Sequence, residues 1–216
     1  MMKDCEVKER YLKFFLDRCL AVVLVIILSP LFLLIVIISK INGLIVPEDR
    51  GWVFFKIERI TKGEKIQLIK FRTVKENLLK SILEKEGRID DIKFLEKDSK
   101  NLTWLGHYLR DFYLDELPQL LNILKGEISF VGPRPYPVSM YEEDLAKGVF
   151  RKKIIRAGLT GLVQINKENI KNKAEEIALD LEYIQKICAL SAFKLLCYDL
   201  KIIFRSLAVV FKGQGL

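Results

Sequence analysis

The stretch CLAVVLVIILSPLFLLIVIIS at residues 19–39 contains no charged side chain. About 20 consecutive apolar residues are enough for a helix to cross the hydrocarbon core of a bilayer. A cleaved signal peptide fits poorly, because its apolar region is usually about 7 to 15 residues long and no small-x-small cleavage site follows this run. We therefore expect residues 1–46 to form a membrane-anchoring segment that stays in the mature protein.

Ser29 and Pro30 lie at the middle of the apolar run. Pro30 has no N–H for the carbonyl four residues earlier, and its ring disfavours helical geometry at Ser29, so we expect a kink. Each half, at about 1.5 Å per residue, reaches only the bilayer centre. Lys and Arg are nearly equal on the two flanks, as if both lay on one side of the membrane, and the Ser29 hydroxyl could bond freed carbonyls. These residues alone favour a re-entrant helix and a kinked span equally.

The chain of 216 residues is half hydrophobic and 30% charged, with a net charge of +8. Nucleic acid is disfavoured as a partner, because the basic residues interleave with acids and form no known reading motif. The four cysteines show no C-x-x-C spacing, and the lone His107 cannot complete a zinc set. Any catalysis must therefore depend mainly on carboxylates, Lys, Arg, Ser or Tyr.

The remainder, residues 47–216, predicts an α+β domain that is mainly α. Residues 52–60 and 65–74 have the pattern of two strands joined by the turn TKGE, a β-hairpin, with Lys70 and Arg72 on one face. By themselves these two cations favour an ordinary solvated strand face over a binding site. Residues 75–100 predict short surface helices broken at Gly87, and we assign them no chemistry.

The C-terminal residues 193–211 predict a mostly apolar helix with a narrow basic stripe. The stripe consists of Lys194, Lys201, Arg205 and Lys212. Such a helix is typical of the membrane interface, and a helix packed in the core is the alternative. The upstream apolar run favours the interfacial interpretation.

Nearly every unusual local feature falls within residues 102–137. Asp115 and Glu116 precede Pro118, which suits a first helical turn, and the helix should end at Gly126. A helix N-terminus favours an ionised carboxylate and bound phosphate, although a simple N-cap is the plainer interpretation of Asp115. Arg134 lies between two prolines, so its guanidinium is stiffly held and suited to phosphate, and a rigid turn with a solvated arginine is an equally good interpretation.

Further on, residues 156–161 (RAGLTG) predict a Gly-rich turn behind a basic cluster. Its N–H groups could cradle phosphate. Without a preceding strand and a P-loop lysine this is a weak signal.

Taken together, these motifs make the chain resemble the small monotopic phosphoglycosyl transferases, a bacterial sugar transferase family that acts on polyprenyl phosphate. The matching motifs run nearly end to end: Asp17 before the Ser29-Pro30 break, Glu58-Arg59, KFRT at 70–73, LR-x4-LDELPQLLNILKGEISFVGPRP, R-x-GLTGL-x-Q-x-N at 156–166, Asp180 with Tyr183, and DLKI at 199–202.

The resemblance implies transfer of a sugar 1-phosphate from a UDP-sugar to polyprenyl (undecaprenyl) phosphate, with Mg2+ and release of UMP. Asp115 would be the nucleophile, with Glu116 beside it as a second catalytic acid, and the two carboxylates would hold the Mg2+. The other implied substrate-binding residues are Lys70, Arg72, Arg110, Arg134, Arg156, Gln164 and Asp180. The family pattern also implies a re-entrant helix that places the catalytic domain on the cytoplasmic face of the bacterial inner membrane, and it leaves a homodimer open.

Several positions depart from the family pattern. Ala157 replaces a proline, and Lys167-Glu168 stand where the family has Gly-Arg. Because the catalytic set is intact, we expect activity with an altered donor preference. The alternative hypothesis is a non-catalytic membrane protein that scaffolds other glycan-assembly enzymes.

Overall fold

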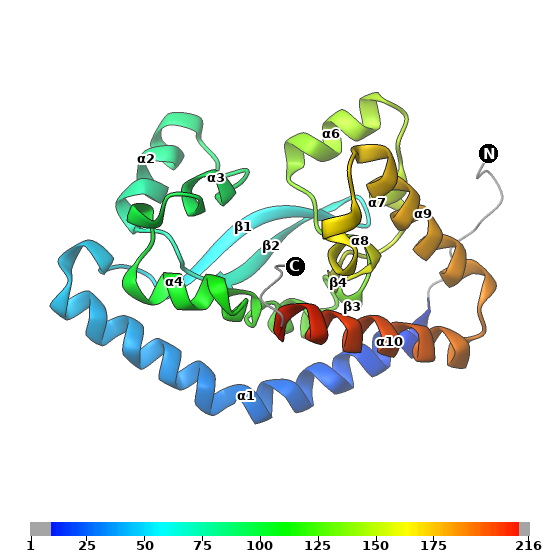
Figure 1. The fold of residues 1–216 in the computed structure, drawn as a ribbon, viewed down its shortest axis with the longest axis horizontal. Coiled ribbons are helices and arrows are strands. Elements are labelled where there is room, and N and C mark those ends of the chain that lie inside the picture. Colours follow the sequence, from blue (N-terminus) through cyan, green and yellow to red (C-terminus); the bar gives the residue numbers. More distant parts are fainter. Residues whose placement is uncertain (1–9, 212–216) are drawn as a thin grey trace.

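A computed structural model of the chain describes residues 10–211. Its N-terminal helix α1, Tyr11–Ile45, contains Pro30 and is bent near its middle (Figure 1). Pro30 cannot donate to the carbonyl of Ile26, and the Ser29 hydroxyl donates to that carbonyl instead, at 2.8 Å. The kink and the role of the serine are therefore as predicted.

One long side of α1 faces the rest of the protein, and the other faces outward. Among residues 10–211, α1 is the one helix long and apolar enough to cross a membrane. Its exposed apolar side chains include Ile26, Ile27, Leu33, Leu34 and Ile37. An apolar surface of this extent requires a non-aqueous neighbour, which supports the predicted membrane association. The other elements lie together above α1 in Figure 1.

The predicted hairpin is confirmed. Strands β1, Phe54–Thr61, and β2, Glu64–Phe71, pair antiparallel around a turn at Lys62 and Gly63. Both turn residues have positive φ, 47° and 78°, as a two-residue hairpin turn requires. Ile57 and Leu68 on one face are buried in the core.

The remaining elements are mainly helical, as expected for an α+β chain of this kind. Gly87, in the left-handed conformation, ends α2 as predicted. The helices are α2 Glu76–Glu86, α3 Lys93–Glu96, α4 Trp104–Asp111, α5 Gln119–Lys125, α6 Val138–Ala146, α7 Arg151–Ile154, α8 Leu162–Ile165, α9 Lys173–Ala189 and α10 Ala192–Phe211. Short 3-10 helices cover Pro47–Asp49, Ser99–Asn101, Leu114–Glu116 and Lys167–Asn169.

A second, parallel two-stranded sheet was not predicted. It pairs β3, Ser129–Val131, with β4, Gly158–Thr160. The Gly-rich segment is thus a strand rather than a phosphate-binding turn, because the N–H of Gly158 donates to Pro133 and that of Gly132 donates to Thr160. A Cβ added at Gly158 would lie 2.1 Å from the Gly132 nitrogen, so the glycines allow this close pairing.

The C-terminal helix α10 has two different faces. Leu195 and Ile202 are buried in the core, whereas Phe193 and Phe204 are exposed. The predicted cations at 194, 201 and 205 are exposed as well, and position 212 lies outside the described residues. The helix is therefore amphipathic and packs one face against the domain.

Candidate active site

A cleft of about 710 Å³ lies between the hairpin, α4, α8 and the loop after β3. It contains most of the charged side chains singled out from the sequence. The predicted residues along its wall are Lys70, Arg110, Asp115, Glu116, Arg134 and Gln164. Six residues from well-separated segments are thus brought together at one site.

The acidic pair lies immediately before α5. Asp115 and Glu116 are in the 3-10 helix Leu114–Glu116, and Pro118 is the N-cap of α5, which ends at a left-handed Gly126. Tyr113, just before the pair, has φ 56°, a conformation that is unusual for a non-glycine residue. Such outliers cluster at functional sites, where the surrounding structure holds them in place.

Lys70, at the end of β2, bridges the two acids. Its Nζ lies 3.0 Å from Asp115 Oδ2 and 2.7 Å from Glu116 Oε1. Asp115 is buried, with 5% of its surface exposed. Strand β2 therefore places the Lys70 ammonium beside the carboxylate of Asp115, the predicted nucleophile.

The environment moves the pKa values of these groups in opposite directions. Burial and the charge of Glu116 raise the pKa of Asp115 above its ordinary value, although Lys70 opposes them. For Glu116, burial is outweighed by Lys70 and Arg134, which lower its pKa. Burial also disfavours the charge of Lys70, but the two carboxylates outweigh it and raise the pKa of Lys70. The site therefore contains one carboxylate that stays ionised and one that protonates more readily.

Arg134 is in the loop after β3, where prolines flank it as the sequence shows. Its Nη2 lies 3.9 Å from Glu116 Oε1. The Arg134 carbonyl accepts a hydrogen bond of 3.1 Å from Lys152 Nζ, and Lys152 in turn contacts Asp180 at 2.8 Å. The loop is thus attached to a buried ionic cluster behind it.

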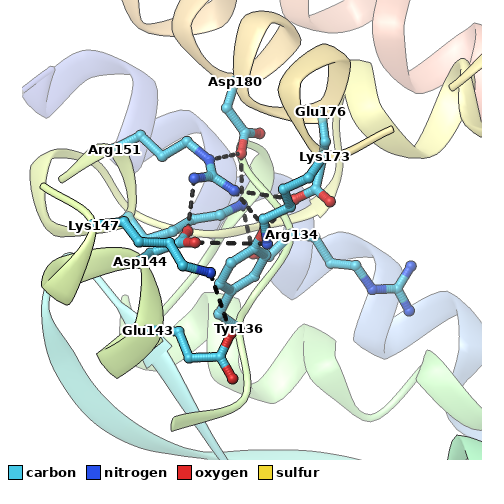
Figure 2. Close-up of polar contacts among 10 residues, drawn as sticks. Arg134, Tyr136, Glu143, Asp144, Lys147, Arg151, Lys173, Glu176 and Asp180 are labelled. Carbon is cyan, nitrogen blue, oxygen red and sulfur yellow. Dashed lines mark hydrogen bonds and ion pairs between the residues drawn. The ribbon is translucent and has the colours of Figure 1, made fainter. Parts of the chain in front are cut away.

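Arg151 is the centre of that cluster (Figure 2). Its side chain is fully buried and contacts Asp144 and Asp180, each at 2.7 Å, and Glu176 at 3.2 Å. In Figure 2 the side chain of Arg134 extends away from the cluster. The cluster holds the backbone of the loop while leaving the Arg134 guanidinium at the cleft.

Three predicted substrate-binding residues lie outside the residues that line the cleft. Asp180, 2% exposed, is bound to Arg151 and Lys152. Arg72 donates to the carbonyls of residues 49, 52 and 74, and β2 ends before it, so it does not accompany Lys70. Arg156 stacks on the ring of Phe14, 4.0 Å from its centroid.

The other two predicted residues reach the cleft. Arg110 donates to Asp111 at 2.8 Å and to the Glu96 carbonyl at 2.7 Å. Gln164 is 3% exposed, and its Oε1 has no hydrogen-bond partner within residues 10–211. A buried amide oxygen of this kind is available to a ligand donor.

Sequence reasoning assigned no chemistry to the segment at 75–100, yet Asp91, Lys93 and Glu96 line the cleft. Arg59, Tyr136, Lys167 and Glu176 line it as well. The segment has mixed charges without a motif, so its sequence carries no signal that separates these residues from a solvated surface. Asp91, Lys93 and Glu96 reach the cleft because of how α3 and the residues before it pack in the fold.

Asp115 and Glu116 are the adjacent carboxylates of the cleft that could hold a magnesium ion. Lys70 contacts Oδ2 of Asp115 and Oε1 of Glu116, and Arg134 lies 3.9 Å from the same Glu116 oxygen. Mg2+ is usually held by one or two carboxylates together with water and substrate phosphates. No larger metal-binding group of His, Cys, Asp or Glu occurs among the described residues.

A family model described as bacterial sugar transferase matches residues 8–213. The chain belongs to the bacterial sugar transferase family. The resemblance deduced from the sequence motifs is thereby confirmed, and so is the prediction of a transferase enzyme.

Individual relatives of this sugar transferase are similar over nearly all of its length. It is 35% identical over 208 residues to the exopolysaccharide production protein ExoY of Sinorhizobium fredii, covering 92% of this chain and 85% of that protein. It is 32% identical to the UDP-galactose-lipid carrier transferase of Erwinia amylovora and 30% identical to the UDP-glucose:undecaprenyl-phosphate glucose-1-phosphate transferase of Escherichia coli. The matches span 96% and 95% of this chain but only 42% and 40% of those longer proteins.

Proposed function

We propose that this sugar transferase moves a sugar 1-phosphate from a UDP-sugar to undecaprenyl phosphate and so starts the assembly of an exopolysaccharide or related glycoconjugate. The observation that carries the proposal is the acidic pair bridged by Lys70 in a cleft lined with cations. The printed activities of the Erwinia and Escherichia relatives supply the substrate classes.

In the first step the ionised Asp115 carboxylate attacks the phosphorus that carries the sugar. A bond forms between a carboxylate oxygen and this phosphorus, and the bond to the bridging oxygen breaks, so UMP leaves with that oxygen. In the second step a phosphate oxygen of undecaprenyl phosphate attacks the same phosphorus and releases the Asp115 carboxylate. Two transfers through one covalent intermediate give ping-pong kinetics.

The surrounding side chains counter the repulsion between an anionic nucleophile and a diphosphate. Lys70 keeps its charge because the two carboxylates raise its pKa, and it lies at the attacking oxygens. Arg134, on its stiff loop, places its Nη2 3.9 Å from Glu116 Oε1 in the same cleft. Asp115 and Glu116 would hold Mg2+, which neutralises charge on the diphosphate when bound.

The membrane helix is proposed to be re-entrant, with both of its flanks and the catalytic domain on the cytoplasmic face. Three observations support this: the bend of α1, the Ser29 hydroxyl at the carbonyl that Pro30 leaves free, and the apolar outer face. The exposed apolar and basic side chains of α10 suit the interface of the same leaflet. Enzyme and lipid acceptor would then share one plane, which raises their effective concentration.

The test is UMP release from a panel of UDP-sugars by the purified full chain, with undecaprenyl phosphate and Mg2+. We expect turnover with at least one donor and loss of UMP release in Asp115→Asn. Full turnover in that variant would remove the nucleophile assignment. No UMP release with any donor, together with capture of partner transferases, would instead support a scaffold.

A further inference from the structure

Four lysine and arginine side chains at the cleft come from four different segments. They are Lys70 at the end of β2, Lys93 at the start of α3, Arg134 in the loop after β3 and Lys167 in the 3-10 helix Lys167–Asn169. The segments are far apart in the sequence, so the fold itself brings these four cations to one cleft. The lining also carries the carboxylates of Asp91, Glu96, Asp111, Asp115, Glu116 and Glu176. A cation there that no carboxylate neutralises attracts an anion.

Lys93 differs in its contacts from three other cations of the cleft, each of which has a carboxylate partner. Lys70 is bound to the acidic pair, Arg110 pairs with Asp111, and Arg59 lies 3.7 Å from Asp91. The ammonium of Lys93 makes no hydrogen bond or ion pair with any residue in the described range 10–211. Asp91, two residues earlier, is engaged by Arg59.

The charges that face Lys93 are mostly of its own sign. Arg134 has the largest effect on the pKa of Lys93, followed by partial burial. Together with smaller effects of Lys167 and Lys70, and against the opposing charge of Asp91, they lower this pKa to about 8. Repulsion between Lys93 and these neighbouring cations costs free energy. A bound anion would offset that cost and raise the pKa of Lys93 toward its ordinary value.

We propose that Lys93 binds the nucleotide phosphate of the donor, the phosphate that leaves as part of UMP. The inference rests on the proposed function. The acidic pair and Lys70 mark where the sugar-bearing phosphate reacts, and the neighbouring phosphate of the diphosphate needs its own cation. Lys93 shares the cleft with this pair but makes no contact with it, and Arg134 faces both.

The experiment measures binding of UDP, and separately of uridine, to the full chain in detergent or nanodiscs by calorimetry. The variants are Lys93→Ala, Lys93→Arg and the control Lys97→Ala, which removes an exposed lysine outside the cleft lining. We expect Lys93→Ala to weaken UDP binding about tenfold or more, as for a lost charge-assisted hydrogen bond. Uridine binding should not change. Lys93→Arg and Lys97→Ala should bind UDP as the wild type does.

Two further measurements separate this role from a structural one. Above pH 8 the wild type should lose UDP affinity as free Lys93 deprotonates, and the loss should be shallower in Lys93→Arg, because arginine stays charged. In turnover assays Lys93→Ala should raise the KM for the UDP-sugar and leave the KM for undecaprenyl phosphate unchanged.

Unchanged UDP affinity in Lys93→Ala would overturn the inference. So would a rise in the KM of the lipid acceptor alone, since that would assign the lysine to the other phosphate. The binding arm needs no turnover, so a protein that releases no UMP but binds UDP through Lys93 would defeat the proposed reaction while supporting the nucleotide site.

Discussion

The Nζ of Lys70 lies 3.0 Å from Oδ2 of Asp115, and the two residues are 45 positions apart in the sequence. The contact joins the end of strand β2 to the 3-10 helix Leu114–Glu116 before α5. Glu116 contacts the same ammonium, with its Oε1 2.7 Å from Lys70 Nζ.

Lys70→Met should reduce the kcat for UMP release by about 100-fold or more, because a preorganised charge at the reacting phosphate is lost. The control is Lys65→Ala on the same strand, whose exposed ammonium pairs with Glu58 at 3.1 Å. It should leave kcat unchanged. Steady-state kinetics of both purified variants tests this, and equal rates for Lys70→Met and the wild type would contradict it.

As the pH is lowered, kcat/KM should begin to fall at a higher pH than it would if Asp115 had the ordinary pKa of an aspartate. Burial and Glu116 raise the pKa of Asp115, so the nucleophile is lost by protonation above the usual range near pH 4. Glu116→Gln removes a neighbouring negative charge, and the acid limb of its kcat/KM profile should move to lower pH. A profile of kcat/KM against pH for both proteins is the measurement. An acid limb that does not move in the variant would argue against coupling of the two acids.

Asp180→Ala should lower the free energy of unfolding by about 3–5 kcal/mol, because the buried cations of Arg151 and Lys152 lose the carboxylate that pairs with both of them. Chemical unfolding in detergent measures this. Glu143→Ala is the matched control, because its pair with Lys147 is exposed at 3.8 Å and should matter by less than about 1 kcal/mol. If Asp180→Ala is as stable as the wild type but loses UDP binding, Asp180 contacts substrate after all.

Pro30→Ala should straighten α1, because an alanine N–H restores the hydrogen bond to the Ile26 carbonyl that Ser29 now occupies. A straight helix of this length favours spanning, so an N-terminal epitope tag should become accessible to protease in spheroplasts. In the wild type the tag should be cleaved only in inverted vesicles. Leu33→Ala, at an exposed apolar position, should behave as the wild type does. Equal tag exposure in Pro30→Ala and wild type would contradict the role of the break.

Much of the local structure follows from short-range sequence features. The apolar run with its proline, the TKGE turn and the glycines at 87 and 126 predict α1, the hairpin and two helix ends, because each depends on neighbouring residues alone. The strand β4 was missed because the residues that pair with it lie about 30 positions earlier. A three-residue strand has no periodicity of its own to detect.

The sequence by itself determined the family, the acidic pair and the break in the membrane helix, since these are written in contiguous motifs. Only the tertiary structure decided which charged side chains line the cleft. Arg72, Arg156 and Asp180 belong to matching motifs but are engaged elsewhere, whereas Lys93 carries no motif and lines the cleft. The reason is physical: the energetics of a charged side chain depend on the groups packed around it, and most of those groups come from distant parts of the chain.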